Sequence, residues 1–286
     1  MNAFGQLATV ISVENLIVLA GIAVFSAWLL DTSLGRRALV QAPTRRNRML
    51  PLTPMIPFFV WFVGTASLQW AVEELIGTLG GWQGQFLDHL LYGIGAAVTV
   101  VLILIIARMD FARGLKGFGL RLHRLPRDAG CAFVTLLAVW PVVLGMIHVT
   151  MEVMKIIYGQ DFEIPKHPQL ELMTESPPVP LQVLLVVLAV VVAPLVEELL
   201  FRGMFQTLLR SYLDRPWVAI FVTSALFASV HLNRTHWPAL FALGVGLGYA
   251  YEKSGSLWRP IFMHALFNGV SVIATLAQEP GVQAGY

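Results

Sequence analysis

Charged residues and cysteine are both scarce in this sequence. Only 13% of the 286 residues are Asp, Glu, Lys or Arg, whereas 57% are hydrophobic and the mean hydropathy is +0.71. Such a composition excludes an ordinary soluble domain and is typical of a polytopic membrane protein. The single cysteine, Cys131, excludes an intramolecular disulfide. The net charge of +2 does not indicate a nucleic-acid partner, and we expect none.

Long apolar segments define the expected fold. A helix needs about 20 apolar residues to cross a bilayer, and eight segments approach or exceed this length. We therefore predict an all-α, polytopic transmembrane helical bundle of about eight spans. Residues 1–9 contain no Lys or Arg, so we expect a retained first span and not a cleaved signal peptide. The predicted spans are residues 7–30, 55–72, 87–107, 129–149, 181–209, 217–231, 237–251 and 257–277.

The positions of the basic residues predict the orientation of the bundle. Sixteen of the 19 Lys and Arg residues fall in alternate loops, those after the first, third, fifth and seventh predicted spans, or in the span ends that border these loops. Basic loops remain on the cytoplasmic side of a membrane. The count therefore predicts that both termini lie outside, in a multi-pass protein of the cell membrane. Residues 152–180 are acidic and contain prolines, and we expect an irregular external loop there.

Two adjacent carboxylates lie inside the fifth predicted span. Glu197 and Glu198 occur in an apolar run, and Arg202 follows Glu198 by four positions, which is the spacing of a helical ion pair. Ionisable groups at membrane depth cost free energy and usually have a function. Arg202 can compensate one carboxylate only, so the second acid is harder to explain as structural. Pro194 is expected to kink this helix and to free the carbonyl of Val190.

Two histidines and an asparagine occur on later predicted spans. Glu198 precedes Asp214 by 16 positions and His231 follows it by 17, so antiparallel helices that turn at Asp214 place both groups at one depth. His264 and Asn268 are four positions apart and share a helix face. We therefore expect the acids, histidines and amide to meet in the cytoplasmic half of the bilayer.

These residues form three motifs in a recognisable order. They are Glu197-Glu198-Leu-Leu-Phe-Arg202, Phe227-Ala-Ser-Val-His231 and His264-Ala-Leu-Phe-Asn268. In order and spacing the sequence resembles the CPBP intramembrane proteases, which include CAAX prenyl proteases, bacteriocin-processing enzymes and Abi-like proteins. The resemblance covers residues 181–277, which would form the catalytic core. Residues 1–180 would supply N-terminal transmembrane helices and the acidic external loop, and residues 278–286 a tail.

The resemblance implies a role for each motif residue. Glu197 would be the general base that activates water, assisted by His231, and Glu198 would support the site. His264 and Asn268 would polarise the scissile carbonyl or hold its oxyanion, while Arg202 and Phe227 would be supporting residues. The substrate would be a peptide or a lipid-modified protein in the bilayer, and prenylated C-terminal peptides are one substrate class of the family.

Alternatives remain open at this level. His231, His264 and Glu198 are also a common ligand set for one divalent metal such as zinc, which would activate the water instead. A transporter could use the same acids and histidines to relay protons or bind a cation. A catalytically silent scaffold could keep the fold alone. Gly244 and Gly248 form a Gly-x-x-x-Gly pair, which we interpret as internal helix packing.

Overall fold

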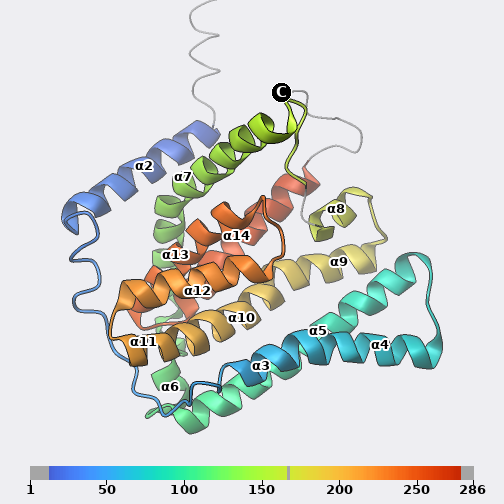
Figure 1. Ribbon diagram of the computed structural model, residues 1–286, viewed down its shortest axis with the longest axis horizontal. Helices are drawn as coiled ribbons and strands as arrows, with labels where there is room; N and C mark the ends of the chain where they lie inside the picture. Colours follow the sequence, from blue (N-terminus) through green and yellow to red (C-terminus); the bar gives the residue numbers. More distant parts are fainter. Residues whose placement is uncertain (1–12, 166–167, 278–286) are drawn as a thin grey trace, which may run out of the picture.

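The computed structural model describes residues 13–165 and 168–277, and within these residues the fold is all-α, as predicted (Figure 1). One isolated antiparallel bridge joins Asn47 to Phe111. The start of the first predicted span and the predicted tail, residues 278–286, lie outside the described residues. The α-helices are α2 (Val13–Asp31), α3 (Met55–Phe59), α4 (Thr65–Ile76), α5 (Gly81–Asp110), α6 (Gly114–Phe118), α7 (Leu125–Tyr158), α8 (Pro168–Thr174), α9 (Val179–Val187), α10 (Ala193–Glu198), α11 (Thr207–Leu213), α12 (Pro216–Val230), α13 (Trp237–Ser254) and α14 (Trp258–Leu276).

Four short helical segments of other geometry join these helices. Three are π-helical, and a 3₁₀ turn, η2, precedes α7. The π-helical segments make α3 continuous with α4, and α9 continuous with α10 and α11, so that two long composite helices result. The segments are η1 (Val60–Gly64), η2 (Leu122–Arg124), η3 (Leu188–Val192) and η4 (Leu199–Gln206).

Four helical stretches are long and apolar enough to cross a membrane, which makes the chain a multi-pass integral membrane protein. They are Met55–Ile76, Gly81–Asp110, Gly114–Tyr158 and Val179–Leu213, and two shorter apolar helices are Asn15–Asp31 and Pro216–Val230. The prediction of about eight spans is therefore matched in part. Helices α13 and α14 do not belong to the four, because polar residues such as Glu252 and His264 lower their mean hydropathy.

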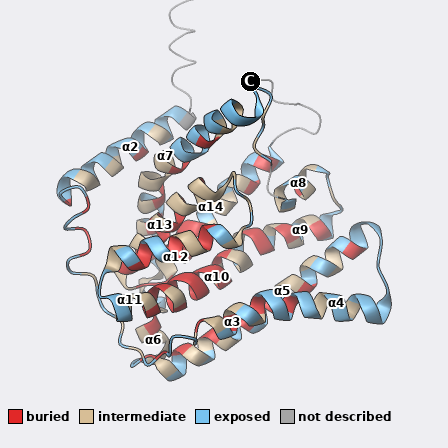
Figure 2. Ribbon diagram, in the orientation of Figure 1, coloured by how far each residue is buried: buried red, intermediate tan, exposed pale blue. Residues whose placement is uncertain are grey.

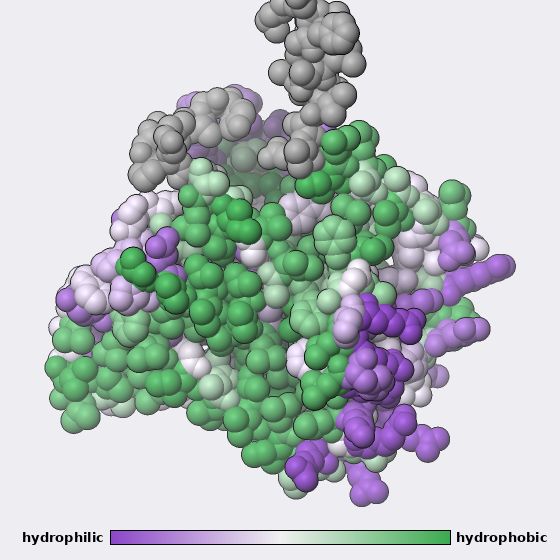
Figure 3. All heavy atoms as spheres, turned by 180° about the vertical axis from the view of Figure 1, so that it is seen from behind, coloured by the Kyte–Doolittle hydropathy of each residue, from purple (hydrophilic) through white to green (hydrophobic). Residues whose placement is uncertain are grey.

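Apolar side chains cover much of the outer surface. Leu90, Val98, Val101 and Ile105 on α5 are all exposed, as are Val183 and Val187 on α9. Figure 3 shows apolar residues over most of one face, with hydrophilic residues gathered along one side. Exposed apolar surface of this extent is suited to contact with lipid.

The buried core surrounds the middle of the composite helix α9–α11. Figure 2 shows buried residues concentrated on α10 and its neighbours, and Figure 1 shows α10 between α12 and α5. Val196, Leu199, Leu200, Phe201 and Met204 are almost fully buried. Unlike the outer helices, this segment has protein on all sides, so it can hold charged groups away from lipid.

The predicted turn after the fifth span is confirmed. Helix α11 ends at Leu213, and Asp214 adopts a left-handed conformation with φ of 48°. Asp tolerates this conformation better than most residues because its short side chain bonds locally. Helix α12 then begins at Pro216 and runs back beside the π-helical segment η4, as the sequence spacing required.

The predicted packing role of the Gly-x-x-x-Gly pair is also borne out. A Cβ on Gly244 would lie 3.0 Å from Ser224 Cβ, and one on Gly248 would lie 3.0 Å from Ile220 Cγ2. Both neighbours belong to α12, so the glycines permit close contact of α12 and α13 within the chain.

The expected irregular loop over residues 152–180 is only partly irregular. Helix α7 continues to Tyr158, and α8 forms between Pro168 and Thr174. Met173 of α8 is buried against apolar residues of α9, because residues 168–174 present Leu170, Leu172 and Met173 to that neighbour. The prediction rested on the acidic and proline content, which does not reveal this apolar side.

Candidate functional site

The two glutamates lie on a short α-helical segment between two π-helical segments. Helix α10 holds Glu197 and Glu198, with η3 before it and η4 after it. Pro194 at the start of α10 lacks an N–H, so the normal helical hydrogen bond cannot form there. The expected kink therefore takes the form of a π-helical segment, a feature that often occurs at functional sites.

Glu198 is fully buried and has two partners. Its Oε1 accepts a hydrogen bond from Arg202 Nη1 at 2.7 Å and lies 2.9 Å from His264 Nδ1. Arg202 is equally buried, and its Nη2 donates to the carbonyl of Gly244 at 3.2 Å. The predicted ion pair is thus present, and Glu198 joins α10 to α14 as well as to η4.

Glu197 is placed differently from its neighbour. It is buried with 8% relative exposure, and its Oε2 lies 3.8 Å from His264 Nε2. No protein atom within the described residues gives that oxygen a hydrogen bond, and the same is true of Glu198 Oε2; the two acids differ because Oε1 of Glu198 is paired with Arg202 and His264. A buried carboxylate oxygen without a protein partner is costly unless a water or a substrate group meets it.

The Phe227 ring lies at the centre of the cluster. Arg202 Cζ is 4.5 Å from its centroid, and the His231 and His264 rings are 4.8 and 5.7 Å away. His231 Nδ1 is 2.8 Å from the carbonyl of Phe227. A carbonyl only accepts hydrogen bonds, so Nδ1 carries the proton and Nε2 of a neutral His231 is a free base.

Asn268 contacts the π-helical segment before the glutamates. Its Nδ2 donates to the carbonyl of Ala189 at 2.8 Å. Sequence reasoning placed the freed carbonyl at Val190, one residue away. An amide nitrogen has two N–H groups, so Asn268 retains a second donor for another acceptor.

The structure therefore brings all of the predicted residues into one neighbourhood. Glu197 contacts His264, His264 contacts Glu198, and Glu198 contacts Arg202. The Phe227 ring joins His231 to this group. Asn268 lies one turn after His264 on α14. The members come from α10, η4, α12 and α14, as the three sequence motifs predicted.

Three features of the site carry no signal in the sequence. Tyr92 of α5 interacts electrostatically with Glu197 and hydrogen-bonds Trp61. The carbonyl of Gly244 is a partner of Arg202. Tyr92 is an uncharged aromatic residue in an apolar run, and a backbone carbonyl has no side-chain signature, so neither is recognisable from residue type and spacing.

His236, in the loop between α12 and α13, is the third such feature. Burial, together with the nearby His231, holds the pKa of His236 below its ordinary value of 6.5. Its Nδ1 is buried without a protein partner within the described residues. The imidazole is therefore neutral near pH 7, and it adds a second histidine beside His231.

The expected metal ligands do not fit a metal well. Glu198 Oε1 already contacts the Arg202 cation and His264, so this carboxylate is compensated within the protein. In the described part of the chain, no group of three or more His, Cys, Asp or Glu residues is arranged to hold a metal ion. A catalytic zinc needs three such donors around one point, and we derive no step through a metal.

The fold and the site together define a class, namely multi-pass membrane proteins with a buried Glu–His–Asn site. Residues 179–270 match the family model of the type II CAAX prenyl endopeptidases described as Rce1-like. The resemblance inferred from the three motifs is thereby confirmed, and the matched segment contains every predicted site residue.

The chain is also similar to two curated proteins. The chain is 30% identical over 112 residues to an uncharacterized 24.3 kDa protein of Escherichia coli, and these residues are 38% of this chain and 52% of the relative. It is 28% identical over 93 residues to the "Putative membrane peptidase YdiL" of Bacillus subtilis, which is 32% of this chain and 38% of that protein. The chain thus spans about half or less of the relatives it matches. No solved structure matches the chain.

Proposed function

We propose that the protein is an intramembrane endopeptidase in which Glu197 activates a water molecule. One observation carries the proposal. Glu197 presents a buried carboxylate oxygen without a protein partner among the described residues, beside a histidine and beside a second carboxylate that Arg202 already compensates. Two adjacent acids in such different surroundings suit different roles, one reactive and one structural.

The reaction follows from these positions. Water bound at Glu197 Oε2 gives a proton to the carboxylate, and the resulting hydroxide attacks the scissile carbonyl carbon. Negative charge then develops on the carbonyl oxygen, where the second N–H of Asn268 stabilises it, together with Nε2–H of His264 in its imidazolium form, since Nδ1–H already donates to Glu198. When the C–N bond breaks, the proton held by Glu197 passes to the leaving amine, and the carboxylate is regenerated.

The remaining residues hold this arrangement in place. Arg202 donates to Glu198, and Glu198 accepts from His264 Nδ1 and so orients the ring toward Glu197. The free Nε2 of His231 is available to assist proton transfer. The contacts of Glu198 are buried, so these polar groups act at low dielectric, where they interact more strongly than in water.

The substrate would be a peptide segment of a membrane-associated protein. Residues 181–277 would form the catalytic core, with the site in the cytoplasmic half of the cell membrane. We further infer that eight segments cross the bilayer and that both termini lie outside, because the basic loops alternate so unevenly. The family description points to prenylated C-terminal peptides as the first substrate class to test.

The test compares Glu197→Gln with the isosteric control Glu74→Gln, which changes an exposed acid at the end of α4. Cleavage would be measured on purified protein with a prenylated peptide, and by proteomic search for products in membranes that express each form. Glu197→Gln should lower the rate by about 10²–10⁴-fold, whereas Glu74→Gln should retain it. Full activity of folded Glu197→Gln protein would overturn the proposal.

Asn268→Ala provides a second readout. It removes the oxyanion donor and also leaves the Ala189 carbonyl unpaired. We expect kcat to fall by about 10²–10³-fold, the loss that follows removal of one such donor. A rise in KM with unchanged kcat would instead assign Asn268 to the packing of η3.

A further inference from the structure

A cavity of about 460 Å³ lies on the side of the bundle that carries the basic loops. Three segments that are distant in sequence form it, namely residues 41–46, residues 112–124 and residues 254–255. Figure 3 shows hydrophilic residues gathered on one side of the molecule, adjacent to apolar surface. The charged side chains that line the cavity are Arg45, Arg46, Arg113, Arg121 and Arg124, and no acidic residue is among the lining residues.

Little of this positive charge is compensated. Arg45 pairs with Glu252 at 3.2 Å, but Glu252 also accepts from Arg210 at 3.1 Å and so is shared by two cations. Arg121 donates to the backbone carbonyl of Lys116. Arg46, Arg113 and Arg124 have no carboxylate partner within the described residues. Three of the other lining arginines lie within electrostatic range of Arg121.

Arg45 is the rigid member of this group. Its side chain is only 4% exposed, its guanidinium lies 3.6 Å from the centroid of the Tyr251 ring, and its Nη2 donates to the Tyr251 carbonyl at 2.8 Å. Its Nε is buried without a hydrogen-bond partner within the described residues. A nearly buried arginine with an unused donor, at the wall of a cation-lined cavity, indicates a place for an anion.

The preference for basic loops on the cytoplasmic side does not explain why five arginines line one cavity. That preference requires arginines on one side of the membrane, but it does not require them to meet at one cavity. Arg36 and Arg37 of the same loop are exposed and do not line it. Guanidinium groups bind phosphate oxygens through paired N–H donors. We propose that the cavity binds a phosphate-bearing anion, either an anionic lipid headgroup or a soluble phosphate compound.

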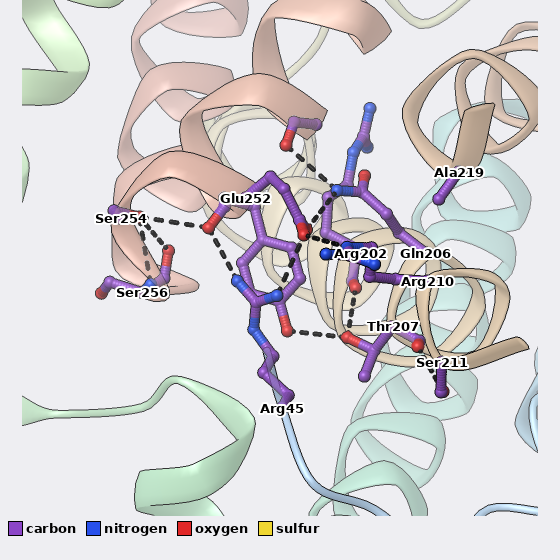
Figure 4. A network of polar contacts seen from close by, with 12 residues as sticks. Arg45, Arg202, Gln206, Thr207, Arg210, Ser211, Ala219, Glu252, Ser254 and Ser256 are labelled. Atoms are coloured by element: carbon purple, nitrogen blue, oxygen red, sulfur yellow. Dashed lines mark hydrogen bonds and ion pairs between the residues drawn. The ribbon is translucent and has the colours of Figure 1, made fainter. Parts of the chain in front are cut away.

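The cavity is connected to the glutamate site by polar contacts, several of which Figure 4 shows. Tyr251, which Arg45 covers, hydrogen-bonds Thr207 at 2.9 Å, and Thr207 in turn donates to the carbonyl of Arg202 at 3.2 Å. Arg202 is the residue that pairs with Glu198. An anion at Arg45 would therefore order the same helix segment, η4, that positions the buried ion pair.

The experiment uses the full-length protein in nanodiscs and measures thermal unfolding, so it does not depend on enzymatic activity. One arm adds pyrophosphate to nanodiscs of phosphatidylcholine, and the other replaces part of that lipid with phosphatidylglycerol. Wild type is compared with Arg113→Gln/Arg124→Gln, and with the charge-matched control Arg36→Gln/Arg37→Gln. Each arginine near a membrane surface contributes about a fivefold factor to anion affinity, so we expect about 25-fold weaker binding in the cavity variant.

Each outcome decides the question. If pyrophosphate raises the unfolding temperature saturably, and the cavity variant loses this rise while the control variant keeps it, the proposal is supported with a soluble ligand. The same pattern with phosphatidylglycerol alone supports it with a lipid headgroup. No rise in either arm, or an equal loss in the cavity and control variants, overturns the proposal, because net charge alone would then account for any effect.

Discussion

The buried ion pair between Arg202 and Glu198 allows a stringent test of the structure. The change Arg202→Met keeps much of the length of the side chain and removes the charge. Glu198, which has no exposed surface, would keep only its contact with His264, and the Gly244 carbonyl would lose its donor. Removal of one member of a buried pair typically costs about 3–5 kcal/mol, because the remaining charge is left without compensation.

The chain contains a matched control at the same spacing. Arg210 and Asp214 are also four positions apart and in contact at 2.5 Å, but the Asp214 side chain is 92% exposed. Asp214→Asn should therefore cost less than about 1 kcal/mol. The free energy of unfolding would be measured for both variants in the same micelles, with helix content followed by circular dichroism.

A double variant separates charge from packing. In Glu198→Gln/Arg202→Met both charges are gone, and the amide oxygen can still accept from His264. We expect the double variant to recover more than half of the stability lost in Arg202→Met. If Arg202→Met is no less stable than Asp214→Asn, Glu198 is not held as a buried anion, and the reasoning about the site is refuted.

Two further predictions concern packing and pH. Gly203→Ala would place a Cβ against the Phe118 ring and should lower the free energy of unfolding by about 1–3 kcal/mol. The control Gly130→Ala places its Cβ in open space and should be neutral or slightly stabilising. Equal effects of the two changes would contradict the packing of Gly203 against Phe118. The pKa of His236 is lowered in the folded protein, so as the pH falls this imidazole is protonated in the unfolded state before it is protonated in the folded state. The free energy of unfolding is therefore highest above about pH 6.5, and it decreases as the pH falls through the pKa of His236 in the folded protein. His236→Gln should flatten this decline in the free energy of unfolding measured between about pH 5 and 7.5, and an unchanged pH slope would contradict the assignment.

Much of the site could be predicted from the sequence because its residues are rare in their surroundings. Glu197, Glu198 and His264 stand out in apolar helices, and the spacing of Glu198 and His231 from the turn at Asp214 sets the relative depth of these two residues. Charged and polar groups inside an apolar segment are therefore the part of a membrane site that residue type and spacing reveal most directly.

Other features depend on packing and could not be predicted. The π-helical segments on both sides of α10 arise where Pro194 and the neighbouring helices alter the hydrogen-bond register, and composition does not encode that register. Tyr92 resembles any aromatic residue in an apolar run. The pairing of Arg45 with Glu252 joins residues 207 positions apart, a separation at which sequence patterns give no information.

The number of spans shows a third kind of difficulty. Hydropathy favours helices whose whole surface is apolar, and α5 and the α9–α11 composite satisfy this condition. Helix α14 carries His264 and Asn268, and α13 carries Glu252 and Lys253, so the mean hydropathy of both helices is lowered. Hydropathy therefore identifies the composite helix that carries the two glutamates but not α14, which carries His264 and Asn268.

The contact of Arg45 with Glu252 and Tyr251 has a consequence for dissecting this protein into parts. The segment that matches the family contains Tyr251 and Glu252 near the end of helix α13. Both are covered by Arg45, which lies in a loop more than a hundred residues upstream of that segment. A fragment trimmed to the family match would lack Arg45 and would expose the Glu252 side chain near the end of α13. The loop that carries Arg45 is therefore needed to keep Glu252 and Tyr251 buried, although it lies outside the segment that matches the family.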